Sequence, residues 1–501
     1  MGKGANEKQE TVEIRKVQPW VSRLLGKWDR ETDVLIVGGG GAGLAAAIEA
    51  AKQGVKVLLL EKARHLGGET LVAAGIFVTA GTSLQRQAGI NFPIERQWER
   101  VSKGLEIVPA KKLRSAYAFL SPPYGIMKRN PDVLKGAVLE GPRTIDWLLD
   151  LGVRFQPLRK ESPTSHVVVG EHDLARMKKV IDLLHAEAKR LGVEILLETK
   201  GAGLYRNAEG RVVGATARTP EGKEINIKAK GAILATGGFV CNQQMVEEYS
   251  PFFARVTPHA IVPKDGSTGD GILMGRAIGA AFEDMDAGCT LCFEHPETKL
   301  VAAGALPPIT IFVYNPVIIV NREGKRFFNE EYAYGAGGME MVRLGYDVAY
   351  YVFDSKVTKG TARRVIEIYL ERGMSVVSSN ISELAKSAGI SPEGLQDTVE
   401  KYNSYVDARL DPDFGRGKIR PDLFQKIDEP PYYCLPFTAV RYKTEGGLMA
   451  NTKGQVLDRV NEEPIPGLYA AGATCGSVVP QLSEALSHGR IVGRNAAQEA
   501  R

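Results

Sequence analysis

Short apolar runs alternate with a helical segment near the N-terminal end of the chain. An apolar run at 33–37 (DVLIV) ends in glycines, an alanine-rich segment covers 44–53, Gly54 stops it, and a second apolar run covers 55–60. A strand, a glycine turn, a helix and a strand in this order form a βαβ unit with two parallel strands. The pattern therefore predicts an α/β fold built on a parallel sheet.

The pattern changes further along the chain and later returns. Up to residue 238 the predicted elements are helices at 131–151 and 174–191, a strand at 193–199, a β-meander at 203–206, 211–219 and 223–229, and a buried strand at 231–238. From about residue 285 short strands mix with prolines and aromatics, followed by a helical stretch at 381–407 and a Pro-rich segment at 411–436. The rhythm of strand, glycine turn and helix resumes at Gly446.

These changes predict a second domain inserted into the first. The length of 501 residues exceeds what one compact core usually supports. The predicted parts are a tail at 1–30, the first part of the main domain at 31–284, an inserted domain at 285–437, and the second part of the main domain at 438–501.

Composition and charge exclude several classes of protein. The net charge of +5 comes without a clustered basic stripe, so nucleic-acid binding is not predicted. No apolar run reaches the roughly 18 residues of a membrane span, and the N-terminus lacks the apolar region of a secretory signal. Five cysteines, an odd and sparse set, fit a reducing compartment, and a cytoplasmic location is predicted. Cys289 and Cys292 form a lone CxxC without a second ligand pair, so no metal site is predicted.

A dinucleotide fingerprint follows the first apolar run. Residues 38–43 (GGGGAG) satisfy GxGxxG: Gly38 permits the tight turn, Gly40 lets backbone approach a pyrophosphate, and Gly43 lets the helix pack on the strand. The helix starting near Ala42 directs free N–H groups at the phosphates. Glu61 closes the second strand, where it can accept hydrogen bonds from an adenosine ribose.

The fingerprint suits NAD and FAD alike, and the rest of the chain favours FAD. Small residues stand at the ends of the strands at 235–238 (ATGG) and 467–473 (GLYAAGA), which suits a long ligand across the sheet edge. The helix near Gln481–His488 could direct its positive end at a flavin. The predicted cofactor-binding residues are Gly38, Gly40, Ala42, Gly43, Glu61, Lys62, Gly68, Glu69, Thr70, Ala74, Gly75, Thr236, Gly237, Asp270, Gly472, Ala473, Gln481 and Leu482.

The chain resembles the fumarate reductase/succinate dehydrogenase flavoprotein superfamily, which includes soluble fumarate reductases and 3-ketosteroid dehydrogenases. The resemblance covers roughly residues 32–499 and rests on motifs in the family's order: DVLIVGGGGAGLAAAIEAA, EKARHLGGETLVAAG, GAILATGGF, TGDGILMGRAIGAA, VNREGKRFFNE, GGLMANTKGQVLD and IPGLYAAGA. It implies a bipartite Rossmann-like FAD-binding domain with an inserted α+β cap domain. It also implies hydride transfer between flavin N5 and one carbon of a C–C bond activated by a carbonyl or carboxylate, with proton transfer at the neighbouring carbon.

The resemblance supplies candidate catalytic residues and alternatives to them. Arg326 resembles the family's proton donor, or is a structural arginine paired with Glu330 or Glu331. His295, in an HP pair, resembles a substrate ligand, or is a surface histidine. Tyr314 lies near the place of the catalytic tyrosine of ketosteroid enzymes.

The expected charged relay after His295 is missing, since the region reads AAGALPPITIFVYN. Lys443 stands where fumarate reductases have a histidine, and the loop at 474–480 carries no positive charge. The remaining pocket is expected to be apolar and aromatic. Its candidate substrate-binding residues are Tyr124, Tyr334, Lys443 and Thr444.

Three functions follow as alternatives. The first is a desaturase or reductase of a C–C bond beside a carbonyl, on a cyclic ketone-like or bulky apolar substrate. The second is reduction of a small unsaturated carboxylate, and the third is a flavin-binding electron-transfer subunit. Because Thr70 replaces the histidine of covalently flavinylated members, FAD is expected to be non-covalent. The electron donor or acceptor is expected to be external, because the sequence has no haem motif or Fe–S cysteine set.

Overall fold

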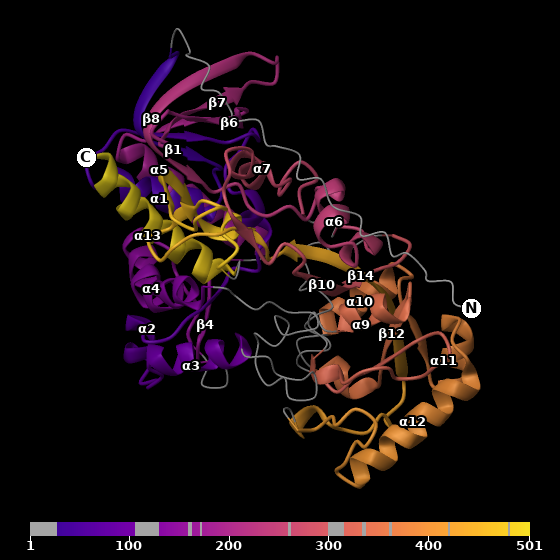
Figure 1. Cartoon of the computed structure of the whole chain (residues 1–501). Helices are drawn as coiled ribbons and strands as arrows, with labels where there is room; N and C mark the ends of the chain where they lie inside the picture. The colour runs from indigo at the N-terminus through magenta and orange to yellow at the C-terminus, as the bar shows by residue number, and fades with distance from the viewer. Residues whose placement is uncertain are drawn as a thin grey trace, which may run out of the picture.

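The computed structural model describes residues 28–105, 130–158, 163–170, 173–258, 262–298, 315–332, 337–359, 363–418, 421–478 and 481–501. Tyr124, Tyr314 and Tyr334 lie outside these ranges, so their predicted roles stay predictions. Figure 1 shows two lobes, one containing both the indigo and the yellow parts of the chain and the other mostly orange.

The first lobe is built on an eight-stranded sheet. Its main path runs β16-β17-β8-β1-β2-β5, and β7 pairs with β8 and β6. β1, β2, β5, β8 and β17 run parallel to their neighbours on this path, apart from the antiparallel edge strand β16. The strands are β1 (Arg30–Val37), β2 (Val57–Leu60), β5 (Glu194–Leu196), β6 (Lys200–Arg206), β7 (Val212–Arg218), β8 (Glu224–Leu234), β16 (Gln455–Leu457) and β17 (Pro464–Ala470).

Helices and short strands complete this lobe. Their bounds are α1 (Gly41–Ala51), β3 (Ile76–Val78), α2 (Ser83–Gln87), α3 (Ile94–Leu105), α4 (Pro131–Asp150), β4 (Ser165–Val167), α5 (Asp173–Arg190), α6 (Gln243–Tyr249), α7 (Asp270–Ala277), β9 (Phe282–Glu283), β15 (Gly447–Leu448) and α13 (Leu482–Ala500). Short 3₁₀ turns are η1 (Gly68–Val72), η4 (Phe253–Arg255) and η9 (Gly472–Thr474).

The last helix, α13, packs directly on the first, α1 (Figure 1). A Cβ atom built on Gly489 would lie 2.3 Å from the Ala42 oxygen, and one on Gly493 would lie 2.3 Å from the Ala46 oxygen. Only glycine permits this separation, because real Cβ contacts are longer. α1 and α13 therefore form one packed unit.

The second lobe is built on a five-stranded sheet with the path β10-β14-β12-β11, and β13 pairs with β14. Apolar clusters cover its two faces. Its elements are β10 (Gly288–Glu294), β11 (Ile318–Val320), η5 (Glu330–Tyr332), α9 (Gly338–Leu344), β12 (Ala349–Phe353), η7 (Ser355–Lys359), α10 (Arg363–Glu371), β13 (Val376–Ser378), α11 (Ile381–Ala388), α12 (Pro392–Asp407), η8 (Pro421–Leu423) and β14 (Tyr432–Thr444).

The predicted α/β class is confirmed, and three predicted elements were wrong in detail. The strands expected at 223–229 and 231–238 are one strand, β8, because Lys228–Gly231 continues its pairing without a break. The helix expected at 381–407 is two helices, since Gly389 adopts a left-handed conformation after α11 and Pro392 starts α12. Part of the Pro-rich segment is β14, which also spans the predicted boundary between 437 and 438.

Candidate functional site

The glycine-rich turn after β1 has the close backbone contacts that the fingerprint requires. Gly38 has φ +110°, and a Cβ there would lie 2.3 Å from the Ala235 oxygen. A Cβ on Gly43 would lie 1.9 Å from the Gly38 oxygen. Both positions therefore need glycine for the turn and for helix packing.

The space above the turn is open. The nearest atom to a Cβ on Gly40 is the Gly67 oxygen at 3.8 Å, and a Cβ on Gly68 would meet only the Gly40 Cα at 3.8 Å. At the start of α1, Gly40 provides no side-chain cap and the first turn has no acidic residue. A helix N-terminus without an opposing carboxylate attracts a phosphate through its N–H groups and its dipole.

Glu61 and Thr70 support this turn in the structure. The Glu61 carboxylate accepts hydrogen bonds from the backbone N–H groups of Gly39 and Ala63, both at 2.8 Å. The Thr70 hydroxyl accepts one from the Gly41 N–H at 3.1 Å. Thr70 lies in η1, directly after Gly67 and Gly68, and Ala74 and Gly75 follow it before β3.

Lys62 and Asp270 form an ion pair across the sheet edge. The Lys62 ammonium lies 2.8 Å from Asp270 and donates to the Thr268 hydroxyl at 2.6 Å, and Lys200 lies 2.9 Å from the other Asp270 oxygen. Burial would raise the pKa of Asp270, but the hydrogen bonds and charges of Lys62 and Lys200 hold it below its ordinary value. Asp270 starts α7, so its ionised form also suits the helix dipole.

The ends of β8 and β17 meet at the same edge. The Thr236 hydroxyl accepts from the Gly271 N–H at 2.9 Å, and the Thr474 hydroxyl donates to the Gly237 oxygen at 3.2 Å. Gly472 and Ala473 lie in η9 after β17. The predicted cofactor-binding residues of these two strand ends are thus brought together.

Behind Gly472 lies a buried histidine. The His488 Nδ1 accepts a hydrogen bond from the Gly472 N–H at 3.3 Å, and burial lowers the pKa of His488 to about 4. The imidazole is therefore neutral at neutral pH, with its proton on Nε2. Gln481 precedes α13 without capping it, Leu482 is its first residue, and Glu484 adds a negative charge to the first turn.

These features fit FAD. Room for a ligand beside Gly40 and Gly68, the start of α1 without an acidic residue, and the carboxylate of Glu61 occur together at the edge of the sheet where β1, β8 and β17 end. When bound there, FAD supplies a two-electron hydride acceptor or donor. In the described parts of the chain, no group of three His, Cys, Asp or Glu residues could hold a metal ion.

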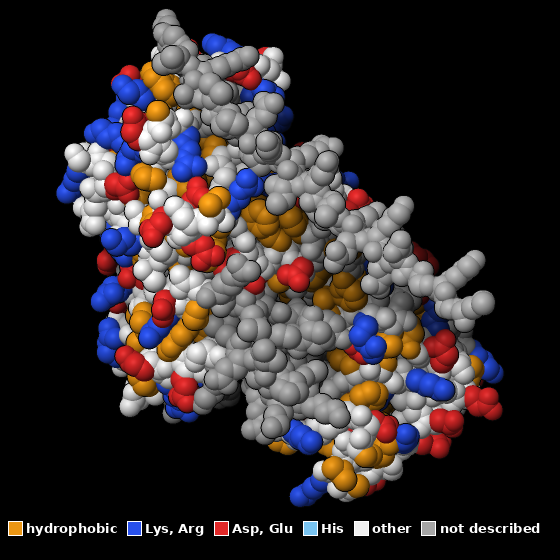
Figure 2. All heavy atoms as spheres, in the orientation of Figure 1, with side chains coloured by type: hydrophobic (Ala, Val, Ile, Leu, Met, Phe, Trp, Pro, Cys, Tyr) orange, Lys and Arg blue, Asp and Glu red, His pale blue; other side chains and the backbone are white. Residues whose placement is uncertain are grey.

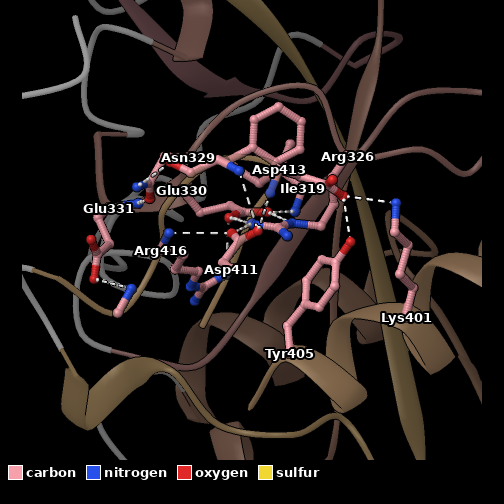
Figure 3. Close-up of polar contacts among 12 residues, drawn as sticks. Ile319, Arg326, Asn329, Glu330, Glu331, Lys401, Tyr405, Asp411, Asp413 and Arg416 are labelled. Atoms are coloured by element: carbon pink, nitrogen blue, oxygen red, sulfur yellow. Dashed lines mark hydrogen bonds and ion pairs between the residues drawn. The ribbon is translucent and has the colours of Figure 1, made fainter. Parts of the chain in front are cut away.

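Arg326 lies in a buried ion-pair network of the second lobe. Its Nε and Nη2 donate to Glu330, both at 2.7 Å, and Nη2 also lies 3.0 Å from Asp411. Arg416 lies 3.2 Å from Glu330 on the other side (Figure 3). Burial would lower the pKa of Arg326, but Glu330 and Asp411 raise it above its ordinary value.

This geometry supports the structural interpretation of Arg326, while its role as proton donor stays a prediction. A guanidinium held by two carboxylates in a buried site is a poorer acid than a free one. The structural alternative, an ion pair with Glu330, is the arrangement found. Figure 3 places the network beside Lys401 and Tyr405 of α12, among elements of the second lobe.

His295 is buried, with 6% of its surface exposed, so the interpretation as a surface histidine was wrong. It follows β10, and its Nδ1 accepts a hydrogen bond from the Thr298 N–H at 3.3 Å. Its role as a substrate ligand stays a prediction.

Lys443 and Thr444 end β14, where this strand reaches the first lobe. The Lys443 ammonium lies 2.9 Å from the buried carboxylate of Glu445, and the Lys443 side chain is 11% exposed. Burial would lower the pKa of Lys443, but the Glu445 charge raises it overall. The Thr444 hydroxyl accepts a hydrogen bond from the Phe239 N–H at 2.9 Å, so it also fixes backbone.

The loop at 474–478 is buried and uncharged. Thr474, Ser477 and Val478 are each 0% exposed, and the Ser477 hydroxyl donates to the buried Glu283. The residues at 479–480 lie outside the described part of the chain.

The sequence did not predict three contacts of this region. They join Ser267 to Glu69, Glu283 to Ser477, and Glu445 to Lys443. Glu69 was predicted to bind cofactor, and the structure adds that its carboxylate accepts a hydrogen bond from the Ser267 hydroxyl at 2.5 Å. The two residues are 198 positions apart, and no local pattern signals such a pairing. Ser267 has a positive φ of 40°, which is uncommon for a residue other than glycine.

The fold and the site together define an FAD-dependent oxidoreductase. The family model described as FAD binding domain matches residues 33–484. The chain belongs to this family and to the fumarate reductase/succinate dehydrogenase flavoprotein superfamily.

Individual relatives agree with this assignment. The chain is 29% identical to a fumarate reductase (cytochrome) of Shewanella frigidimarina, covering 93% of this chain and 77% of the relative. It is 30% identical to a urocanate reductase of Eggerthella lenta, covering 93% and 75%. It is similar to the crystal structure of 3-ketosteroid-Δ4-(5α)-dehydrogenase from Rhodococcus jostii in complex with 4-androstene-3,17-dione, with TM-score 0.72, 26% identity and coverage of 95% and 98%.

On the face shown in Figure 2, Lys and Arg side chains are interspersed with Asp and Glu over both lobes. Among the helices described, none combines the length and apolarity that crossing a membrane requires.

Proposed function

We propose that this protein uses non-covalently bound FAD to desaturate or reduce a C–C bond beside a carbonyl, on a cyclic ketone-like or bulky apolar substrate. The electron donor or acceptor is a separate molecule. Among the relatives, one is named for the reduction of fumarate, one for the reduction of urocanate, and one is a ketosteroid dehydrogenase in complex with a cyclic ketone. All three names fit chemistry at a C–C bond near a carbonyl or carboxylate.

The observation that carries the choice of substrate is the charge at the end of β14. Lys443 is neutralised by Glu445 at 2.9 Å, and the neighbouring loop at 474–478 is buried and carries no cation. A dicarboxylate needs positive charge or several N–H donors to offset its desolvation. A ketone needs only one or two donors, so this site favours a neutral carbonyl compound.

The proposal is tested by anaerobic flavin spectroscopy of the purified holoprotein. The panel contains saturated and unsaturated cyclic ketones, and unsaturated mono- and dicarboxylates. Bleaching of oxidised flavin by a saturated ketone, or reoxidation of reduced flavin by an enone, supports the proposal. A response to carboxylates alone supports the second alternative, reduction of an unsaturated acid. Bound flavin that responds to no compound favours the electron-transfer alternative.

A variant tests the charge argument itself. Glu445→Gln leaves the Lys443 ammonium without its carboxylate, so affinity for unsaturated carboxylates is expected to rise by roughly tenfold or more, as for one charge-assisted contact. The measurement is the concentration of carboxylate needed for half-maximal reoxidation of reduced flavin. An unchanged value in a folded, FAD-bound variant would show that Lys443 does not face the substrate.

A further inference from the structure

A group of four side chains gathers where the two lobes meet the cofactor cradle. Glu69 comes from η1, Cys241 from the turn after β8, Ser267 from the turn before α7, and Lys443 from the end of β14. We name these residues the Glu69 cluster. Each comes from a different segment, and Glu69 directly follows Gly68 of the open glycine cradle.

Ser267 contacts Glu69 through its side chain and Cys241 through its backbone, and it lies close to Gly237. The Ser267 hydroxyl donates to the Glu69 carboxylate at 2.5 Å, and a Cβ on Gly237 would lie 3.1 Å from the same hydroxyl. The Ser267 backbone oxygen accepts from the Cys241 N–H at 3.2 Å. The positive φ of Ser267 is an observed strain, which usually persists where a site needs it.

Burial outweighs the polar neighbours of Glu69 in the shift of its pKa. Burial raises the pKa of the Glu69 carboxyl, against the Ser267 hydrogen bond and the Lys443 charge, which both lower it. Burial, followed by the charge of Glu69, raises the pKa of Cys241 to about 11, and Arg441, Lys62 and Asp265 also act on this thiol. Glu69 is thus the one carboxyl group of the cluster, and its pKa lies above the ordinary value of a glutamate.

We propose that Glu69 is the acid–base group of the reaction, and that Ser267 positions its carboxyl group. This inference rests on the proposed function. In the reducing direction the neutral carboxyl group gives its proton to the carbon next to the carbonyl, and the other carbon of the double bond receives a hydride with its two electrons from reduced FAD. Glu69 is left as a carboxylate, stabilised by Lys443 and Ser267, and is reprotonated from solvent. Desaturation is the same step in reverse.

A general acid–base group must be able to both lose and regain a proton, and Glu69 meets this requirement better than Arg326 does. Both forms of a carboxyl group are accessible, whereas the Arg326 guanidinium is held cationic by Glu330 and Asp411. Glu69 also adjoins the glycine cradle in sequence, whereas the Arg326 side chain lies buried within the second lobe.

The inference is tested first without substrate, on the holoprotein. The visible absorbance of oxidised flavin is recorded between about pH 5 and about pH 9, because an ionising group near the flavin shifts its bands. The wild type is expected to show one transition above the ordinary range of a glutamate. Glu69→Gln should abolish it. Ser267→Ala should move it to higher pH, because the Ser267 hydrogen bond favours the carboxylate. Cys241→Ser is the matched control and should leave it in place.

A second measurement uses any substrate that the panel of ketones and carboxylates identifies. Glu69→Gln should lower the rate of flavin reduction or reoxidation by roughly 100-fold or more, the usual contribution of a general acid or base, with FAD still bound. Ser267→Ala should shift the pH profile of the rate in the same direction as the absorbance transition.

The outcomes separate the two proposals. A transition that persists in folded Glu69→Gln, or a wild type without one, overturns the role of Glu69. A rate in Glu69→Gln equal to that of the wild type does the same. If the wild type turns over no compound on the panel, the proposed function fails, while the absorbance titration still decides whether Glu69 ionises beside the flavin.

Discussion

Two glycines of the turn after β1 have opposite surroundings, although they are three residues apart. A Cβ on Gly40 would have no atom nearer than 3.8 Å, whereas one on Gly43 would lie 1.9 Å from the Gly38 oxygen. Gly43 therefore serves the packing of α1 on β1. The backbone at Gly40 leaves room for a further atom, and the prediction that the FAD pyrophosphate lies there fits this space.

This contrast gives a prediction at the residue scale. Gly40→Val should leave the free energy of unfolding of the apoprotein nearly unchanged and weaken FAD binding by roughly tenfold or more, or about 1.4 kcal/mol. Gly43→Ala should destabilise the apoprotein by at least about 1–3 kcal/mol, the usual cost of overpacking. Denaturant unfolding and titration with FAD measure both effects. Gly203→Ala, where a Cβ meets nothing within 4 Å, is the control.

Arg326 provides a second prediction at this scale. Arg326→Met leaves Glu330 and Asp411 buried without one of their partners, which should cost about 3–5 kcal/mol of unfolding free energy. Arg326→Lys keeps the charge but loses the bidentate contact, so it should cost less and retain turnover per FAD-bound molecule. Loss of turnover in a stable Arg326→Lys would support the proton-donor interpretation.

At the scale of elements, the contact between α1 and α13 decides whether the cradle is complete. α13 begins after the loop that follows η9, and it approaches α1 through Gly489 and Gly493. Ion pairs reinforce this contact: Arg490 and Arg494 of α13 reach Glu49 of α1 and Glu140 of α4. The start of α1 is therefore fixed by the last twenty residues of the chain.

Gly489→Ala should separate these two helices, because its Cβ would lie 2.3 Å from the Ala42 oxygen. We expect a loss of about 1–3 kcal/mol in unfolding free energy together with weaker FAD binding. Gly136→Ala in α4 is the matched control. Its Cβ would meet only Ile491 at 4.0 Å, so helix propensity should stabilise the protein by roughly 0.5–1 kcal/mol. Equal effects of the two substitutions would contradict the packing argument.

At the scale of the whole molecule, the stability of the protein should depend on pH through His488. The pKa of His488 is about 4 in the folded protein, below its ordinary value of 6.5. Between these values the unfolded chain binds a proton that the native state does not, so stability falls as pH falls from 6.5 toward 4. The full loss of unfolding free energy across this window is about 3 kcal/mol.

The measurement is the thermal midpoint of wild type and His488→Phe at several pH values in this window. The variant should lose less stability on acidification than the wild type does. The difference between the pH dependences of the two thermal midpoints reports on His488 alone, because both proteins contain Glu69. Glu69 acts in the opposite direction: its pKa is raised in the folded protein, so its contribution to stability is lost as pH rises. His65→Gln, a change at an exposed histidine, should keep the wild-type slope.

The sequence by itself determined the features that depend on neighbouring residues. The βαβ unit, the glycine fingerprint and Glu61 lie within 32 residues, and their spacing alone predicts the turn, the helix start and the dinucleotide site. The motifs in the family's order also predicted the superfamily and FAD, both of which the comparisons confirm.

Only the tertiary structure decided which side chains share a site. Glu330, four residues from Arg326, was an alternative that the sequence offered, but Asp411 lies 85 residues from Arg326 and Ser267 lies 198 residues from Glu69. Spacing could therefore not separate a catalytic arginine from a structural one or reveal the Glu69–Ser267 contact. Burial, which sets the pKa of Glu69 and of His488, is likewise a property of the packed chain. Local patterns fix backbone geometry, whereas the protonation and charge of a site depend on contacts made after the chain has folded.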